Sequence, residues 1–273
     1  MNIIEKFISI QGEGIRTGRP SLFVRVSGCN LRCVFHNADG KTVSTCDTSY
    51  ASFHPEASNR KSLRDEIFDC LEILEANPMV NDVVITGGEP LLDQPGLVKF
   101  IKGINVYKDY TITIETNGTI TPADELLELV SLWSVSPKLS SSTPTERDCK
   151  KYEIAKEYAK SHEERRINIE ALSDIVAYGH DVQMKFVYSS EKCVDEILSI
   201  RDSIQDCVNG IVKESKGFLS PVDVNSLIML MPEGITEKAI LSKSDECVQK
   251  CIFHGWTFSS RMHILIWGNV KEK

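Results

Sequence analysis

Short apolar runs alternate with longer segments of helical pattern along most of the chain. The runs are rich in β-branched and aromatic residues, and several stop at glycine, proline or asparagine, which is the pattern of buried parallel strands. The strands predicted in this way are residues 21–26, 83–86, 110–116, 133–136, 182–188 and 227–231. A further apolar run follows at 261–267.

The intervening segments are predicted to be helices. The clearest case is 63–76, which has Ser62 as an N-cap and two acidic residues, Asp65 and Glu66, in its first turn. The other predicted helices are residues 94–103, 123–132, 194–204 and 236–253, with charged helical sequence over 146–178. Strand and helix in alternation predict an α/β fold with one parallel sheet, either open or an incomplete barrel. We expect a single domain over 1–273, with an inserted loop at about 34–45 and a charged helical insertion at about 140–180.

Polar motifs follow four of the predicted strands. They are Thr86-Gly87-Gly88-Glu89-Pro90, Glu115-Thr116-Asn117-Gly118, Ser136-Pro137-Lys138 and Met231-Pro232-Glu233-Gly234. Right-handed connections place the carboxyl ends of parallel strands on one side of the sheet, where α/β barrels keep their active sites. The four motifs, with a cysteine-containing loop after the first predicted strand, therefore predict a single site.

Composition and charge narrow the class of protein. The chain has 273 residues, of which 41% are hydrophobic and 26% charged, as in ordinary globular proteins. The net charge of −8 argues against a nucleic-acid-coating surface. No apolar run approaches the roughly 20 residues that span a bilayer, and the N-terminal residues lack a secretion-signal pattern. We expect a cytoplasmic protein without a membrane or nucleic-acid partner.

Three of the nine cysteines suggest chemistry. Cys29, Cys33 and Cys46 lie shortly after the first predicted strand, and three thiolates can hold three irons of a 4Fe–4S cluster while the fourth iron stays open to a ligand. The isolated Cys70, Cys149, Cys193 and Cys207 are interpreted as small buried hydrophobic residues.

A second group of possible metal ligands lies near the C-terminus. Cys247, Cys251 and His254 have a spacing that suits either a second metal or a packed helix face. We favour the helix face because free cysteines are usually buried.

The cysteines and two of the strand-end motifs resemble those of radical S-adenosylmethionine (SAM) enzymes. Cysteines after one strand, Gly87-Gly88-Glu89-Pro90 after the next and Glu115-Thr116-Asn117-Gly118 after a third match that superfamily. The resemblance implies an incomplete barrel with the cluster and SAM at the carboxyl ends of the strands. It also implies that SAM binds the open iron and is cleaved to a 5′-deoxyadenosyl radical.

A narrower resemblance covers nearly the whole chain. It lies in 9–14, 18–21, 23–25, 28–33, 46–48, 136–138, 185–187, 261–263 and 267–269, and it is to the 7-carboxy-7-deazaguanine synthase family. The resemblance implies ring contraction of 6-carboxy-5,6,7,8-tetrahydropterin to 7-carboxy-7-deazaguanine with release of ammonia, on the route to queuosine and other deazapurines. It further implies hydrogen abstraction from C6 of the substrate, regeneration of SAM, a homodimer, and an electron donor such as flavodoxin or ferredoxin.

The resemblance also implies a role for each matching position. The cluster ligands would be Cys29, Cys33 and Cys46, and the Thr48 hydroxyl would bind Mg²⁺. The residues implied to line SAM are Thr45, Asp47, Gly88, Glu89, Thr116, Ser136, Pro137, Lys138, Gln183, Lys185 and Phe186. The residues implied to bind the pterin are Gln11, Gly12, Glu13, Arg25, Thr86 and His263. Gln11 and Glu13 suit the hydrogen-bonding edge of a pterin, and Arg25 suits its carboxylate.

The sequence departs from the family pattern in three places. His36 occupies the position where the third cysteine is usually found, and Cys46 follows after an insertion; we favour Cys46 as the ligand because thiolates dominate cluster ligation. The insertion at 140–180 predicts a solvated cap or a partner surface, of which we favour the first. The chain also lacks the terminal proline found in some members of the family.

Simpler interpretations of single residues stay open from the sequence alone. Residues 11–14 could form a glycine turn, Thr48 could be a helix N-cap, and Lys138 could be a surface lysine. Two alternative functions also remain. One is a glycyl-radical enzyme activase, which would consume SAM and require a protein partner. The other is an Fe–S or zinc-binding regulator without catalysis.

Overall fold

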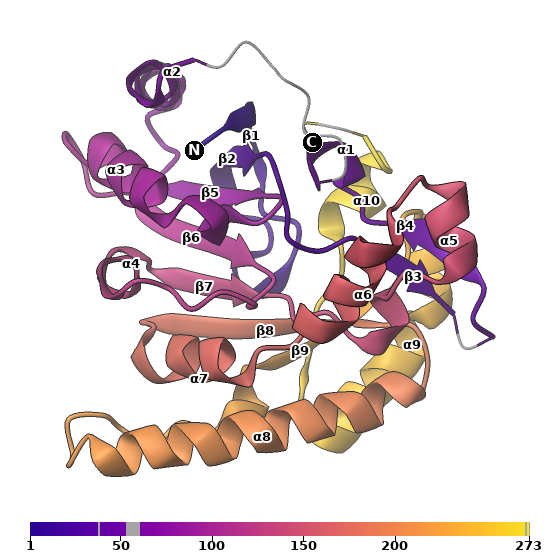
Figure 1. Cartoon of the computed structure of the whole chain (residues 1–273). Coiled ribbons are helices and arrows are strands. Elements are labelled where there is room, and N and C mark those ends of the chain that lie inside the picture. The colour runs from indigo at the N-terminus through magenta and orange to yellow at the C-terminus, as the bar shows by residue number, and fades with distance from the viewer. Residues whose placement is uncertain (38, 53–60, 271, 273) are drawn as a thin grey trace.

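One long sheet organises the chain (Figure 1). The structure is a computed structural model that describes residues 1–37, 39–52, 61–270 and 272. Within these residues the sheet has the strand order β1-β2-β5-β6-β7-β8-β9-β10, and β3 and β4 form a separate pair. The strands are β1 (Ile3–Ile10), β2 (Pro20–Val26), β3 (Val34–His36), β4 (Thr42–Thr45), β5 (Asp82–Gly87), β6 (Thr111–Thr116), β7 (Leu132–Val135), β8 (Asp181–Tyr188), β9 (Ile228–Pro232) and β10 (Thr257–Phe258).

Helices connect the strands and cover the outer face of the sheet, where α2, α3, α4, α7 and α8 are seen in Figure 1. The α-helices are α1 (Ser49–Ser52), α2 (Leu63–Ala76), α3 (Gln94–Ile104), α4 (Asp124–Leu129), α5 (Glu146–Lys151), α6 (Lys156–Arg165), α7 (Ile169–Tyr178), α8 (Lys192–Glu214), α9 (Glu237–His254) and α10 (Met262–Trp267). Short 3₁₀ turns are η1 (Gly14–Arg16), η2 (Pro90–Asp93), η3 (Ser140–Ser142) and η4 (Val224–Leu227). None of the helices among the described residues is long and apolar enough to cross a membrane.

From β2 to β10 all neighbouring strands of the sheet are parallel, which confirms the predicted α/β fold. The sheet stays open, so the barrel is incomplete, as expected. The short strands β3, β4 and β10 were not predicted, and neither was β1, which pairs antiparallel with β2 and forms an edge of the sheet. Its sequence mixes apolar and polar residues, because an edge strand does not need the continuous apolar run of a central parallel strand.

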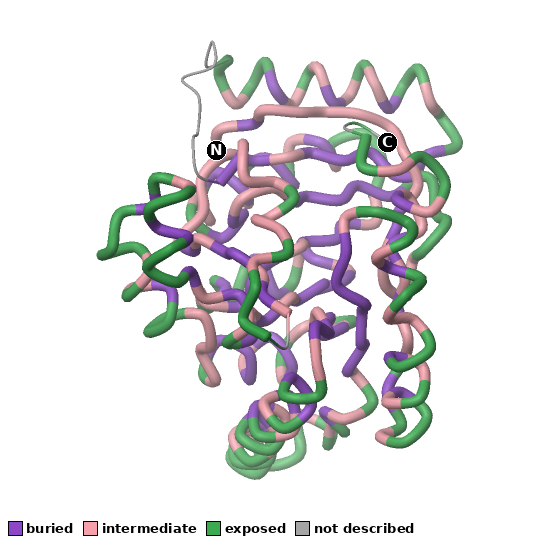
Figure 2. Tube along the Cα trace, turned by 90° about the vertical axis from the view of Figure 1, so that its right-hand side faces the viewer, coloured by how far each residue is buried: buried purple, intermediate pink, exposed green. Residues whose placement is uncertain are grey.

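The core lies between the sheet and the covering helices. Its largest fully buried side chains include Trp133, Tyr188, Phe100 and Phe186. Figure 2 shows buried positions running along the central strands, while the covering helices expose one side. Ser62 caps α2 as predicted, with its hydroxyl accepting a hydrogen bond from the Asp65 backbone N–H.

Several predicted boundaries were wrong. The helix predicted over 123–132 is shorter, because the chain enters β7 at Leu132. The helix predicted over 194–204 is part of the longer α8. The charged stretch 146–178 breaks into α5, α6 and α7, with Glu153 at a positive φ of 54° in the first break and Asn168 capping α7. The apolar run at 261–267 is the helix α10.

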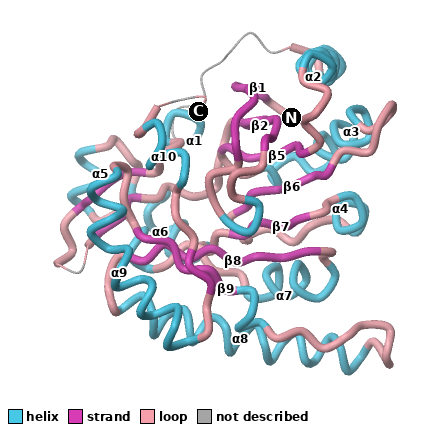
Figure 3. Tube along the Cα trace, turned by 180° about the vertical axis from the view of Figure 1, so that it is seen from behind, coloured by secondary structure: helices cyan, strands magenta, loops and turns pink. Residues whose placement is uncertain are grey.

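The two predicted insertions pack against each other beside the carboxyl ends of the strands. Figure 1 shows the β3–β4 pair close to α5 and α6, and Figure 3 shows α5 and α6 from behind, on the opposite side of the molecule from α3 and α4. Val34 from the first insertion joins Cys149 and Ile154 from the second in a small apolar cluster of their own. Two segments that are distant in sequence therefore form one layer over this end of the sheet.

Candidate active site

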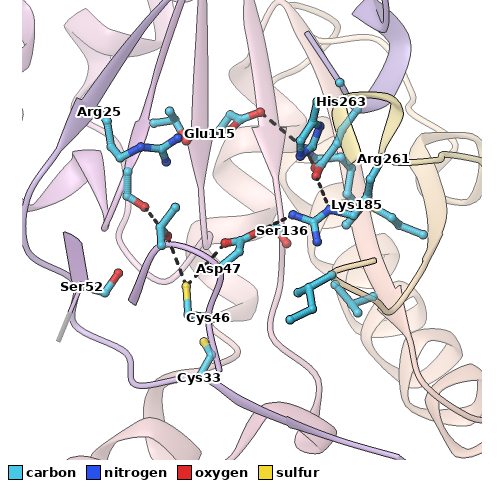
Figure 4. A pocket seen from close by; sticks show the side chains of 18 of the residues that line it. Arg25, Cys33, Cys46, Asp47, Ser52, Glu115, Ser136, Lys185, Arg261 and His263 are labelled. Carbon is cyan, nitrogen blue, oxygen red and sulfur yellow. Dashed lines mark hydrogen bonds and ion pairs between the residues drawn. The ribbon is translucent and has the colours of Figure 1, made fainter. Parts of the chain in front are cut away.

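A pocket of about 290 Å³ opens where the parallel strands end (Figure 4). Cys33 and Cys46 lie toward one end of it, and Arg25, Glu115 and His263 lie toward the other (Figure 4). The predicted site residues that line this pocket are Gln11, Gly12, Glu13, Arg25, Cys29, Cys33, Thr45, Cys46, Asp47, Thr48, Thr86, Gly88, Thr116, Ser136, Lys138, Lys185 and His263. The strand-end motifs and the cysteine loop thus meet, as expected from a parallel sheet.

The three predicted cluster ligands come from two neighbouring segments. Cys29 and Cys33 lie in the loop after β2, and Cys46 follows β4. The Cys46 backbone N–H donates to the Cys33 carbonyl oxygen at 3.1 Å, which holds the segments together. In the same loop, the Leu31 N–H points at Cys29 Sγ, 3.4 Å away.

The donor set fits an iron–sulfur cluster. Burial raises the pKa of all three thiols, that of Cys29 to about 12, and the proximity of the other cysteines raises it further for Cys29 and Cys33. Such thiols ionise when they bind metal. No three His, Cys, Asp or Glu side chains of the described chain are placed to hold a single metal ion. A cubane uses three thiols differently, because each of its thiolates binds a different iron.

His36 lies outside this set. Its Nδ1 faces the Ser141 carbonyl oxygen at 3.1 Å, and its Nε2 faces Asp148 Oδ2 at 2.8 Å. Burial alone would raise the pKa of Asp148, but hydrogen bonds from Thr145, Thr42 and His36 outweigh it and hold this pKa below its ordinary value. Both ring nitrogens of His36 are therefore engaged in joining the two insertions.

Glycines allow the loop after β5 to contact the cysteine loop after β2. A side-chain carbon at Gly88 would lie 1.8 Å from the Gly28 carbonyl oxygen, so only glycine fits. Glu89 is buried beneath this contact, and its carboxylate accepts hydrogen bonds from the Leu91 and Asn117 backbone N–H groups and from the Thr116 hydroxyl. It does not line the pocket, and the structure shows it bracing two strand-end motifs.

Oxygen donors suitable for Mg²⁺ lie near the cysteines. Thr48 Oγ1 is 3.3 Å from Cys46 Sγ and 3.4 Å from the Gly87 carbonyl oxygen, and it lines the pocket. Mg²⁺ commonly takes few protein ligands and completes its shell with water and substrate oxygens, so this donor set fits the ion.

A network of charges extends from the opposite end of the pocket to Asp47, which directly follows Cys46. Glu13 accepts from Lys185 Nζ at 2.8 Å and from Arg261 Nε at 3.0 Å, and Arg261 also pairs with Asp47. Burial alone would raise the pKa of Glu13, but the two cations outweigh it and lower this pKa below its ordinary value. The pKa of Lys185 is raised, because Glu13 and Glu115 outweigh its burial. The network is internally compensated.

Glu115 joins the predicted substrate residues, although it was not among the predicted site residues. It accepts from the Thr86 hydroxyl at 2.7 Å and from the Gln11 amide at 3.2 Å, and Lys185 Nζ lies 3.6 Å away. Its signal in the sequence was the strand-end motif that it begins. Lys185, predicted to line SAM, accordingly lies among the predicted substrate residues.

The Arg25 side chain is oriented by Glu5 and Tyr50, which were not among the predicted site residues. Its Nε donates to Glu5 Oε2 at 2.7 Å, and the Tyr50 hydroxyl donates to the same oxygen at 2.9 Å. Glu5 comes from β1, a strand that was not predicted. A guanidinium held by its Nε keeps its outer N–H groups available for a carboxylate.

His263 reaches the pocket across Gly12. The Met262 N–H donates to the Gly12 carbonyl oxygen at 2.8 Å, which joins the start of α10 to the loop after β1. A side-chain carbon at Gly12 would lie 2.0 Å from His263 Nδ1. Burial lowers the pKa of His263, which favours the neutral ring.

Three further predicted SAM residues lie outside the pocket lining, together with Glu89. Phe186 is fully buried in the core, and Pro137 is not a lining residue. Gln183 instead supports the loop after β1: its Oε1 accepts from the Ile15 N–H at 2.8 Å, and its Nε2 donates to Ser134 Oγ at 2.8 Å.

The C-terminal cysteines form part of the core. Cys247 and Cys251 are buried on the inner face of α9, and His254 stacks on Trp256 with ring centroids 4.4 Å apart. No metal-binding group of three such side chains occurs here or elsewhere in the described ranges. The interpretation as a packed helix face fits this arrangement.

Comparison with known proteins gives the class and then the family. Residues 10–150 match the family model described as "4Fe-4S single cluster domain", so the fold and site are those of an iron–sulfur protein with one cluster. The chain is 33% identical to a 7-carboxy-7-deazaguanine synthase of Halobacterium salinarum, over 99% of this chain and 91% of that protein. It is also 33% identical to the synthase of Rhodopirellula baltica, over 98% of this chain and 86% of that protein. The chain belongs to the 7-carboxy-7-deazaguanine synthase family.

A solved structure supports the fold. The crystal structure of QueE from Escherichia coli matches with a TM-score of 0.53 and 21% sequence identity, and the match covers 96% of this chain and 94% of that chain. The two chains share the open, mostly parallel α/β sheet.

Proposed function

We propose that the protein converts 6-carboxy-5,6,7,8-tetrahydropterin to 7-carboxy-7-deazaguanine with release of ammonia. The observation that carries the proposal is one pocket with two unlike ends, three thiols at one and a compensated set of charged and amide side chains at the other. Full-length similarity to proteins named for this activity supports it.

At the thiol end, Cys29, Cys33 and Cys46 would hold a 4Fe–4S cluster with one open iron. When bound, the cluster and SAM would supply the radical chemistry for hydrogen abstraction from the substrate. The chain's part there is to bind and enclose. The residues proposed to line SAM are Thr45, Asp47, Gly88, Thr116, Ser136 and Lys138. Of the other residues predicted to do so, Glu89, Pro137, Gln183 and Phe186 lie outside the pocket lining and would act only by supporting it.

At the charged end, Arg25 would bind the substrate carboxylate through the N–H groups that Glu5 leaves available. Gln11, Glu13, Thr86 and His263 would bind the pterin edge, which carries both donors and acceptors. Lys185 would hold Glu13 ionised and in place. These contacts fix one orientation of the reacting carbon and exclude water from it.

Thr48 would contribute its hydroxyl to Mg²⁺, with other positions taken by water and substrate oxygens. The ion would orient the substrate and stabilise charge on its oxygens.

Further expectations belong to this proposal. We include a one-electron donor such as flavodoxin or ferredoxin, a homodimer, a cytoplasmic location, and action of the chain as one domain. The small-molecule pocket and the continuous sheet agree with the expectation that the chain acts as one domain. An activase or a non-catalytic regulator is disfavoured, since relatives over nearly the full length carry the synthase name.

The test is an anaerobic assay of the reconstituted, reduced protein with SAM, Mg²⁺ and 6-carboxy-5,6,7,8-tetrahydropterin, followed by mass spectrometry. We expect 7-carboxy-7-deazaguanine without stoichiometric loss of SAM. Cleavage of SAM without that product would overturn the substrate assignment, and a fully assembled cluster without either reaction would favour a regulator.

A further inference from the structure

A histidine from the charged insertion makes a hydrogen bond inside the cysteine loop. His162 lies on α6, is fully buried, and its Nδ1 accepts the backbone N–H of Arg32 at 3.1 Å. Arg32 immediately precedes Cys33, one of the proposed cluster ligands. The preceding amide in the loop, that of Leu31, points instead at Cys29 Sγ. Two successive amides near the cysteines thus have different acceptors.

The other ring nitrogen fixes the tautomer of His162. Its Nε2 is 3.2 Å from Ser142 Oγ, and that hydroxyl donates its own hydrogen to the Leu139 carbonyl oxygen at 2.7 Å. Ser142 must therefore accept from Nε2–H, which leaves Nδ1 as an acceptor for Arg32. Burial lowers the pKa of His162 to about 4, in agreement with a neutral ring.

The helix that carries His162 is anchored on both sides of the cysteine loop. The Arg32 guanidinium lies over the Tyr158 ring of α6, 4.6 Å from its centroid. Just after α6, Arg166 Nη1 donates to the Lys138 carbonyl oxygen at 3.2 Å, in the motif that follows β7. The insertion is thereby fixed relative to two segments that line the pocket.

A second connection joins the insertions themselves. Asp148 of α5 is fully buried and binds both His36 of β3 and, at 2.6 Å through Oδ1, the Thr42 hydroxyl of β4. Cys46 follows directly after β4. The α5–α6 insertion therefore contacts the chain next to Cys33 and, through the β3–β4 pair, the chain next to Cys46.

We propose that His162 is a positioning residue for the cluster: it binds the Arg32 amide, fixes the peptide plane beside Cys33, and keeps that N–H from donating to a cluster sulfur. Hydrogen bonds to the sulfurs are among the features that set the reduction potential of an iron–sulfur cluster, and added N–H donors stabilise the more negative, reduced state. The α5–α6 insertion is then part of the cluster's support, in contrast to the solvated cap favoured from its sequence. The inference rests on the proposed function in needing a cluster at these cysteines.

The test compares His162→Gln with His162→Asn in the reconstituted holoprotein. Asparagine places its side-chain oxygen near the position of Nδ1, whereas glutamine reaches the position of Nε2, so only asparagine can still accept from Arg32. His180→Gln, at an exposed histidine, is the matched control. The readouts are iron content, the reduction potential from a redox titration followed by electron paramagnetic resonance (EPR), and the rate of iron loss to a chelator.

We expect His162→Gln to raise the reduction potential and to speed iron loss by about fivefold, the factor that one backbone hydrogen bond contributes. His162→Asn should restore most of both values, and His180→Gln should match the wild type. Ser142→Ala keeps the imidazole but removes the partner that fixes its tautomer, so it should show a smaller shift in the same direction. It also provides the measurement if the His162 variants fail to fold.

If the wild type assembles its cluster, and His162→Gln and Ser142→Ala have the same reduction potential and rate of iron loss as the wild type, the inference is overturned while the proposed function stays intact. The same holds if melting temperature falls but the potential does not move, since that result describes a merely structural histidine. A wild-type protein that assembles no 4Fe–4S cluster would overturn both.

Discussion

The two ends of the pocket differ in how the charge of their ionisable side chains is balanced. At the substrate end, the cations Lys185 and Arg261 are balanced by the carboxylates of Glu13 and Asp47, so these charges are paired before a ligand binds. At the thiol end, burial raises the pKa of Cys29, Cys33 and Cys46, so the chain alone keeps the thiols protonated. One end is preformed for a polar organic molecule, and the other requires metal to reach its working charge state.

This contrast predicts that the two ends of the pocket bind their ligands in different ways. A preformed charged site loses little conformational freedom when a ligand arrives, which favours orientation of the substrate. Thiols of high pKa bind metal only with release of protons, so assembly of the cluster end should be favoured by higher pH and reducing conditions. Substitutions should therefore have separable effects at the two ends.

The largest effect is expected from removing a thiol. Cys46→Ala should abolish iron–sulfur assembly and activity, because the remaining two thiols cannot hold a cubane. His36→Asn should retain the cluster, because both nitrogens of His36 are engaged outside the pocket, but it should lower the free energy of unfolding by roughly 2 kcal/mol, since asparagine does not reach the Nε2 position that binds buried Asp148. Iron and sulfide analysis of the reconstituted proteins measures the cluster content of both variants. Full iron in Cys46→Ala with loss of iron in His36→Asn would contradict the assignment.

At the charged end, Arg261→Gln should destabilise the chain by about 3 kcal/mol, since it removes the cation paired with Asp47 and one of the two cations that compensate Glu13. Arg261 also donates to the Gly234 carbonyl oxygen at 3.0 Å. A lysine cannot span three acceptors, so Arg261→Lys should recover only part of the loss. Urea unfolding monitored by circular dichroism measures the free energy of unfolding of both variants. Wild-type stability in Arg261→Gln would show that the network contributes little.

The buried His162 predicts a pH dependence of stability. Its pKa is about 4 in the folded chain and 6.5 ordinarily, so between these values the unfolded chain binds more protons. The stabilisation is complete above pH 6.5 and is lost as the pH falls toward 4, amounting to roughly 2 kcal/mol between pH 7.5 and 5.0. Urea unfolding of the iron-free chain at these two pH values should show this loss in the wild type and a smaller one in His162→Asn. Equal losses would rule out His162 as the source.

The smallest effect is expected from one methyl group. Gly12→Ala places a carbon against His263 Nδ1 and should displace that ring, weakening substrate affinity by about tenfold, the equivalent of one lost contact. Cluster content should not change. In a double-mutant cycle, Gly12→Ala should cost little more in a His263→Ala background. Additive losses in substrate titrations would mean that Gly12 acts by another route.

The sequence predicts the site better than it predicts the site's support. Thr86, Gly88, Thr116 and Lys138 are found together because each lies at or just after the end of a parallel strand, and the topology alone makes those ends meet. The thiols were identified because few other residues hold such a cluster. These features depend on local pattern and on a general rule of chain connection.

What escaped prediction depends on contacts between distant segments. β1 mixes Glu5 and Lys6 with apolar neighbours, which resembles no buried strand, yet Glu5 aims Arg25. The roles of Asp148 and His162 arise only once the two insertions pack together. Helical charge patterns cannot distinguish a helix in solvent from one whose single buried face carries a histidine.

The most direct test of separate roles at the two ends is EPR spectroscopy of the reduced protein with and without SAM, beside product analysis, in wild type and Arg25→Ala. The account predicts that SAM alters the cluster signal equally in both, whereas Arg25→Ala forms at most a few per cent of the wild-type product, because a carboxylate contact contributes about 2 kcal/mol or more. A cluster signal in Arg25→Ala that no longer responds to SAM, or product formed at the wild-type rate, would contradict it.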